Sequence, residues 1–235
     1  MSLILAADTT TAVNTVALCT ETDILAETLV DCRRLHSERL LATVDWVLGE
    51  AGRSLSDVSA LAVSVGPGSF TGLRIGAATW KGLALANRLP LVGVPTLDAM
   101  ARLGAWHDGL VCPLIDARMK EVFGAWFRFE AGLRTRLTPD RVCPVEELLD
   151  ACPADTGLPA FVLGDGAAAY RDRVLAHAPG VVFVPPVCGM PRASAVAFEA
   201  FDRLAAGDGA DASSLSPVYL RKSQAEVNRD RRAAP

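Results

Sequence analysis

Acidic and hydroxyl side chains follow two predicted strands, and these are the residues best suited to phosphate chemistry. The apolar run 3–7 ends at Asp8, which Thr9–Thr10 follow. A carboxylate and hydroxyls at such a corner can bind a phosphate group through magnesium. The run 110–115 ends in the same way at Asp116. The two aspartates could form a carboxylate pair across one cleft, although Asp and Thr are also ordinary turn residues.

A glycine-rich stretch, residues 64–76, is the second candidate for anion chemistry. Its glycines at Gly66, Gly68 and Gly72 give the spacing G-x-G-x-x-x-G, which is one residue longer than the dinucleotide fingerprint. No Gly-Lys-Ser/Thr closes the loop as it would in a Walker P-loop. The glycines permit a backbone approach to an anion at a helix N-terminus, but a sharp turn with close helix packing is the favoured interpretation.

The chain lacks the usual patterns of metalloenzymes and serine hydrolases. Its histidines, His36, His107 and His177, lie far apart and form no H-x-x-x-H or H-E-x-x-H motif. Ser69 stands in Gly-Ser-Phe-Thr-Gly, which is not the G-x-S-x-G of a nucleophile elbow. The six cysteines form no C-x-x-C, so scattered buried thiols in a reducing compartment are favoured over disulfides.

Composition and charge exclude further classes of protein. With 235 residues, of which 51% are hydrophobic, the chain can form one large or two small domains with an ample core. A formal net charge of −4 does not give the basic footprint of a stand-alone nucleic-acid-binding protein. No apolar run approaches the roughly 18 residues of a membrane span, and the start lacks the basic segment of a signal peptide. A cytoplasmic protein without membrane contact is therefore expected.

Strands and helices alternate along the first half of the chain. Runs 3–7, 13–19 and 24–30 predict three strands with short connections, as in an antiparallel meander. Residues 36–49 carry apolar side chains at helical spacing and predict an amphipathic helix. The apolar run 61–65 predicts a buried strand that leads into the glycine-rich stretch.

The helix expected over residues 71–88 is apolar around most of its circumference. Such a helix is buried on more than one side. Gly72, Gly76 and Thr79 share one face of it, where another backbone could approach closely. Because a sheet covers only one side of a helix, we expect a partner helix against this glycine-bearing face.

The second half of the chain repeats the organisation of the first. The run 110–115 predicts a strand that ends at an aspartate, and residues 121–129 alternate as a further strand would. The run 160–163 leads into a Gly-Asp-Gly turn. Strands with helices between them, repeated in this way, predict an α/β fold of two related lobes. We expect a first lobe over residues 1–104, a second lobe over 105–220 and a basic, flexible tail over 221–235.

The glycine-rich stretch and the helix after it resemble the signature of the TsaB (YeaZ) family. The likeness continues along most of the chain in short motifs at Lys81–Ala84, Gly93–Met100, Ile115–Arg118, Gly164–Gly166 and Pro217–Arg221. TsaB proteins are partners in making the threonylcarbamoyl modification of adenosine in tRNA. The resemblance implies the actin-like (ASKHA) fold of two ribonuclease H-like lobes.

The resemblance also implies a non-catalytic dimerisation subunit. Such a subunit binds and stabilises a TsaD-like catalytic subunit, which adds threonylcarbamoyl to N6 of adenosine 37 in tRNAs that read ANN codons. A TsaE-like ATPase joins the complex, and tRNA is bound only through the complex. The chain alone would bind no cofactor, whereas ATP or ADP could lie at the subunit interface. A homodimer could form through the same helix.

The surface for the partner is expected on the helices predicted near residues 35–49 and 71–88. Each helix offers apolar or small side chains at helical spacing. The expected contact residues are Gly72, Gly76, Thr79, Trp80, Leu83, Leu41 and Val44.

No metal ligand is expected by comparison with the catalytic paralogue. TsaD carries two metal-binding histidines four residues apart. Aligning the chains on Gly93–Pro95 puts Thr96 and Met100 at those two positions, and neither side chain can replace an imidazole there. A metallopeptidase activity loses its physical basis for the same reason.

Two other functions stay open at the level of sequence. The first is an actin-like nucleotide-dependent kinase or ATPase, in which Asp8 and Asp116 surround a phosphate and Thr9–Thr10 complete the corner. The missing phosphate loops weigh against it. The weaker alternative is a glycopeptidase of the M22 type, for which metal ligands are missing.

Overall fold

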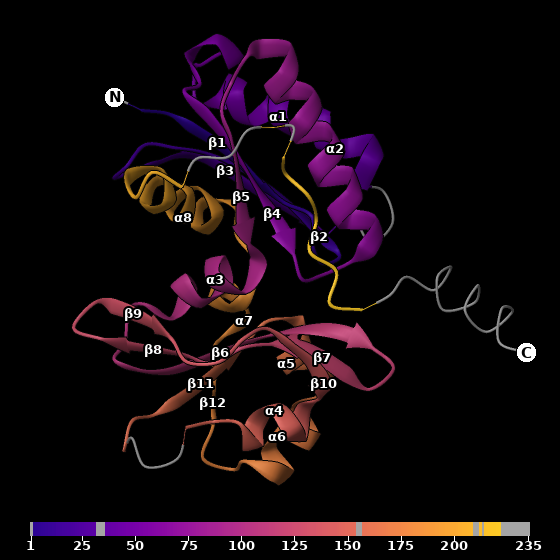
Figure 1. Cartoon of the computed structure of the whole chain (residues 1–235), viewed down its shortest axis with the longest axis vertical. Coiled ribbons are helices and arrows are strands. Elements are labelled where there is room, and N and C mark those ends of the chain that lie inside the picture. The colour runs from indigo at the N-terminus through magenta and orange to yellow at the C-terminus, as the bar shows by residue number, and fades with distance from the viewer. Residues whose placement is uncertain (1, 32–35, 154–156, 209–211, 213, 222–235) are drawn as a thin grey trace, which may run out of the picture.

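The molecule consists of two lobes, each built around one sheet (Figure 1). The computed structural model describes residues 2–31, 36–153, 157–208, 212 and 214–221. A five-stranded sheet forms the first lobe and a seven-stranded sheet forms the second. The predicted α/β fold of two lobes is confirmed. Apart from Arg221, the tail predicted over 221–235 lies outside the described residues.

The first sheet begins with the antiparallel meander that the sequence predicted, and two parallel strands extend it. β2 pairs with β3 and with β1 in antiparallel fashion, and β1, β4 and β5 are parallel. Its strands, in spatial order, are β3 (Ile24–Asp31), β2 (Val13–Cys19), β1 (Ile4–Asp8), β4 (Ala60–Gly66) and β5 (Leu91–Pro95).

Helices cover both faces of this sheet, so β1, β2 and β4 are buried along their whole length. On one face lie α1 (His36–Glu50) and α2 (Phe70–Asn87), which pack against Leu5 and Val16. On the other face lies α8 (Ala193–Ala205), against Ile4 and Ala6. Neighbouring residues of β1 therefore point into different cores, as the period of a strand requires.

α8 corrects the expected domain boundary. It was predicted within a second lobe of residues 105–220, but it packs on the sheet of the first lobe (Figure 1). Its buried face is made largely of small residues, including Ala193, Ala197 and Ala200, which allow close contact with the sheet. The chain thus crosses from the first lobe to the second and returns.

The second sheet is centred on β6 and takes strands from residues 109 to 183. The single strand predicted over 121–129 is wrong, because the chain bends at Trp126 and forms two strands that pair with different parts of β6. The strands are β6 (Gly109–Arg118), β7 (Glu121–Gly124), β8 (Phe127–Glu130), β9 (Leu133–Arg136), β10 (Arg141–Pro144), β11 (Ala160–Leu163) and β12 (Val182–Phe183).

Short helices pack beside this sheet or join the lobes. Figure 1 places α3 and α7 between the two lobes. Two 3₁₀ turns complete the described helical structure, one at Leu55–Asp57 and one at Arg102–Gly104. The short helices are α3 (Thr96–Ala101), α4 (Val145–Asp150), α5 (Asp165–Ala169), α6 (Arg171–His177) and α7 (Pro186–Gly189). No helix in the described ranges is long and apolar enough to cross a membrane.

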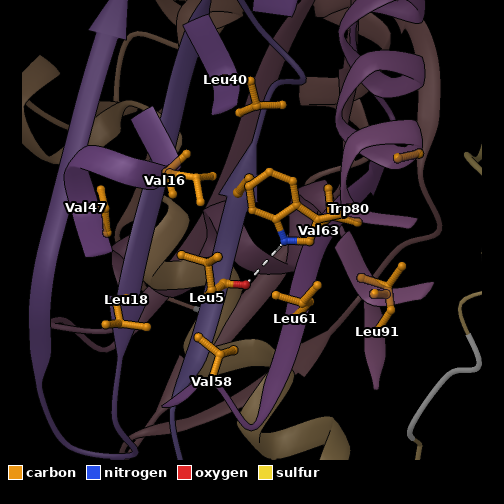
Figure 2. Close-up of a cluster of buried hydrophobic side chains, with 14 of the residues drawn as sticks. Leu5, Val16, Leu18, Leu40, Val47, Val58, Leu61, Val63, Trp80 and Leu91 are labelled. Carbon is orange, nitrogen blue, oxygen red and sulfur yellow. Dashed lines mark hydrogen bonds between the residues drawn. The ribbon is translucent and has the colours of Figure 1, made fainter. Parts of the chain in front are cut away.

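Trp80 lies at the centre of the first-lobe core (Figure 2). Its side chain is fully buried, and the indole Nε1 donates a hydrogen bond of 3.3 Å to the carbonyl oxygen of Leu5. The bond satisfies the polar atom of a large apolar side chain, as buried indoles require. It also fixes α2 to the middle strand of the sheet. The labelled neighbours in Figure 2 are Val16, Leu18, Leu40, Val47, Val58, Leu61, Val63 and Leu91.

Candidate functional site

The predicted phosphate corner is a buried hydrogen-bonded turn. Asp8 is 1% exposed, and its Oδ1 accepts hydrogen bonds from the backbone N–H of Thr10 at 2.9 Å and from its hydroxyl at 2.7 Å. The other oxygen, Oδ2, accepts one from the hydroxyl of Ser64. Thr9 donates to the carbonyl oxygen of Gly72 at 2.8 Å. The corner therefore joins β1, β4 and the first turn of α2.

Asp116 is engaged separately, within the second lobe. Its Oδ1 accepts hydrogen bonds from the N–H of Arg118 at 2.8 Å and from the hydroxyl of Tyr170 at 3.0 Å. Its own N–H donates to Asp165 at 3.0 Å. Burial raises the pKa of Asp165, and the charge of Asp116 raises it further. These contacts hold the β6–β7 turn against α5 and α6.

Asp8→Asn is expected to destabilise the chain by about 1–2 kcal/mol, because a carboxylate with several buried hydrogen bonds would become an amide with fewer acceptor sites. Urea unfolding at neutral pH measures the loss. Asp45→Asn on the exposed side of α1 is the matched control and should unfold like the parent protein. Equal stability of the Asp8 variant would mean that the corner has no structural role.

The glycine-bearing face of α2 packs against the chain itself, which corrects part of the expected partner surface. A Cβ at Gly76 would lie 2.5 Å from Thr9 Oγ1, and a Cβ at Gly72 would overlap the carbonyl oxygen of Thr9. Trp80 and Val44, also expected at the interface, are 0% and 3% exposed in the first-lobe core. The small residues accommodate the β1–β2 turn, so these four residues offer no contact to a partner.

The remaining expected contact residues differ in how accessible they are. Leu83 is half-buried against the first-lobe core, and Thr79 is also half-buried. Leu41 is 54% exposed on α1. A contact between Leu41 and a partner stays a prediction that the fold permits.

A different stripe of α2 faces outward. Ala78, Gly82 and Leu85 are exposed at positions i, i+4 and i+7, and Leu85 is 66% exposed. A Cβ at Gly82 would meet no atom within 4 Å. α1 packs beside α2 and presents Trp46, which is 52% exposed.

We call these residues, together with Leu41, the two-helix surface. Sequence reasoning missed Ala78, Gly82 and Leu85, although their helical spacing was the signal that could have found them. An exposed apolar side chain such as Leu85, on the same stripe as small residues, suits contact with another protein.

Thr96 and Met100, the positions at which the resemblance led us to expect no metal ligand, have structural roles here. Thr96 is fully buried, and its hydroxyl accepts a hydrogen bond of 3.1 Å from the N–H of Gly66. Met100 is 1% exposed in the core of the second lobe. Among the described residues, no group of three or more His, Cys, Asp or Glu side chains could hold a metal ion.

The cysteines of the described ranges are free thiols. Burial raises the pKa of Cys19 to about 12, with the nearby charge of Glu27 adding to the shift. Burial also raises the pKa of Cys112 and Cys143. Because the thiolate is the reactive form, these buried thiols are inert at neutral pH. Cys32 lies outside the described residues.

Comparison with known proteins places these features in a family. A family model described as TsaD, tRNA N6-adenosine threonylcarbamoyltransferase, matches residues 30–229. TsaB of Bacillus subtilis (strain 168), a tRNA threonylcarbamoyladenosine biosynthesis protein, is 30% identical over 225 residues, which are 95% of this chain and 96% of that protein. TsaB of Escherichia coli (strain K12) is 36% identical, over 94% of this chain and 96% of that protein.

Solved structures agree with the sequence relatives. YeaZ from Pseudomonas aeruginosa is 33% identical with a TM-score of 0.81, over 94% of this chain and the whole of that chain. Component A of (R)-2-hydroxyglutaryl-CoA dehydratase from Acidaminococcus fermentans has a TM-score of 0.56 at 11% identity, over 87% of this chain and the whole of that chain. The latter likeness concerns the fold alone, and it confirms the expected actin-like architecture. With relatives of this identity along nearly its whole length, the chain belongs to the TsaB (YeaZ) family.

Proposed function

We propose that this chain is the non-catalytic dimerisation subunit of the machinery that makes threonylcarbamoyladenosine in tRNA. In this proposal it binds a TsaD-like catalytic subunit in the cytoplasm and stabilises its active form, and a TsaE-like ATPase joins the pair. The complex adds threonylcarbamoyl to N6 of adenosine 37. The curated relatives named for this biosynthesis support the pathway.

The two-helix surface is the observation that carries the dimerisation role. Leu85 is exposed on α2 on the same stripe as the small residues Ala78 and Gly82, and the neighbouring helix α1 exposes Leu41 and Trp46. A TsaD family model matches most of this chain, so a TsaD-like partner shares its fold and has corresponding helices to offer. Two such surfaces can pack against each other about an approximate twofold axis. In the absence of the TsaD-like partner, two copies of this chain would form a homodimer through the same surface.

The proposal of a non-catalytic role is supported by the polar side chains, which make hydrogen bonds within the chain itself. Asp8 is buried in the first lobe with hydrogen bonds to both carboxylate oxygens, and Asp116 is held in the second. Thr96 and Met100 stand where the paralogue has its metal ligands. In this proposal any nucleotide of the complex lies at the interface or on a partner, and tRNA is bound by the assembly.

Reconstitution with purified components tests the proposal. The isolated chain is expected neither to modify tRNA nor to hydrolyse ATP above background. Adding it to TsaD-like and TsaE-like proteins should restore modification that the two give poorly without it. ATP turnover by the isolated chain, lost in a folded Asp116→Asn variant, would instead support the kinase alternative. Full modification without this chain would contradict the subunit role.

A further inference from the structure

Residues 214–221 run along the first lobe and reach the second lobe at their end (Figure 1). We call this segment the latch. At its first-lobe end Leu215 is 5% exposed and belongs to the same core as Trp80. The N–H of Val218 donates a hydrogen bond of 2.7 Å to the carbonyl oxygen of Val65. The latch therefore adds to the end of β4.

The middle of the latch contacts the first turn of α2. The ring of Tyr219 lies 4.8 Å from the ring of Phe70, centroid to centroid. Arg74 stacks on Phe70, with Cζ 3.9 Å from the ring centroid, and its Nε donates a hydrogen bond of 3.2 Å to the Tyr219 hydroxyl. This cluster orients the helix end that begins the two-helix surface.

The other end of the latch is fixed to the second lobe. Leu220 is half-buried against the core that contains Ile115 and Phe123. Arg221 donates a hydrogen bond of 2.8 Å to the carbonyl oxygen of Ala117 and forms an ion pair with Glu121. The latch thus places Leu215 in the first-lobe core and Leu220 against the second-lobe core.

On another side of the lobe junction there is open space. A cavity of about 580 Å³ lies between the lobes, lined by Phe198 of α8, by Phe129 and Leu133 of the β8–β9 hairpin, and by Arg102. The lobes are therefore not packed against each other along this part of the junction, and beside the cavity Arg134 of β9 pairs with Glu199 of α8 at 2.8 Å.

We propose that residues 214–221 are an interlobe latch that holds the two lobes at one angle. The chain also crosses between the lobes at α3 and at the segment from α7 to α8, and these crossings would act as the hinge. When the second-lobe end of the latch is released, the lobes rotate and the first turn of α2 loses its fixed neighbour. Because α2 carries the two-helix surface, the angle between the lobes would then affect partner binding. That effect rests on the proposed function, whereas the proposal that residues 214–221 hold the lobes at one angle does not.

Distance measurements between spin labels on the two lobes test the latch without any partner. Labels are attached at Arg53→Cys and Arg141→Cys, which are exposed sites on different lobes. Cys32, Cys152 and Cys188 are first replaced by serine, so that the spin labels do not attach to them. The labelled parent is expected to give one narrow distance distribution. The doubly substituted variant Leu220→Ser, Arg221→Ala should give a second, shifted population.

Arg173→Ala is the matched control, because it removes an ion pair with Glu146 that lies wholly within the second lobe. Its distance distribution should equal that of the parent. Should the double variant fail to fold, Glu121→Gln removes the ion pair from the second-lobe side alone and should broaden the distribution. Folded variants with the parent's narrow distribution would overturn the latch. A second population in Arg173→Ala as well would overturn it too, since the movement would then reflect general loosening.

Discussion

Replacing Gly82 by leucine should leave the chain folded and weaken its binding to a TsaD-like subunit by about ten- to a hundredfold. A Cβ at this position meets no atom of the chain within 4 Å, so the added side chain projects into open space. On the two-helix surface it would hold a partner helix away from Ala78 and forfeit contacts across the centre of the interface. Titration calorimetry measures the affinity, and thermal melting monitors the fold.

Gly76→Leu is the matched variant on the opposite face of the same helix. Its Cβ would lie 2.5 Å from Thr9 Oγ1, and the rest of the side chain would enter the packed contact between α2 and the β1–β2 turn. We expect a protein that does not fold stably, whatever its partner. If Gly82→Leu binds the partner at wild-type strength, the interface does not include the exposed stripe of α2. If Gly76→Leu folds stably but binds poorly, the interface lies on the glycine-bearing face instead.

Much of this fold could be predicted from local sequence patterns. The alternation in residues 13–19 and the apolar periodicity of 36–49 each depend on short-range geometry, and both elements are present. The path of α8 could not be predicted, because its Ala-rich face suits either lobe and only the three-dimensional path of the chain decides between them. The bend at Trp126 was missed because an alternating run of suitable residues does not reveal where one strand changes partner.

The candidate site was harder to predict than the fold. α2 carries small residues on two faces, one with Gly72 and Gly76 and one with Ala78 and Gly82. Spacing identifies both stripes but does not tell which one meets the chain's own backbone. The decisive contact is with Thr9, more than sixty residues away in sequence. Asp8 shows the same limit, since its residue type suits phosphate binding while its partner Ser64 gives it a structural role.

Glu199→Gln should destabilise the chain by about 1–3 kcal/mol at neutral pH, because Arg134 and Arg102 lose their most buried charged partner and keep only Asp98 and Asp202. Glu199 is 6% exposed on α8. Its Oε1 pairs with Arg134 of the β8–β9 hairpin at 2.8 Å, and its Oε2 pairs with Arg102 at 3.1 Å. The residue therefore joins the returning helix to the second lobe beside the interlobe cavity.

The pH dependence of this difference identifies the carboxylate charge as its cause. Burial raises the pKa of Glu199, but the hydrogen bonds and charges of Arg134 and Arg102 outweigh it, so the net pKa lies below its usual value. A lowered pKa contributes stability above the pKa of the unfolded chain, about 4.3, and loses it as pH falls through the folded value. Urea unfolding should therefore show a full difference between parent and variant at neutral pH and a diminishing one below about pH 4.

Asp202→Asn is the control for a change of charge at the same cluster. Asp202 also pairs with Arg102, but its side chain is 66% exposed, and exposed ion pairs contribute about 0–1 kcal/mol. Its unfolding should stay close to that of the parent at every pH. If the difference in unfolding free energy between the parent and Glu199→Gln persists unchanged in acid, packing rather than charge causes the loss of stability. In that case the ion pairs of Glu199 would not be what holds α8 to the second lobe.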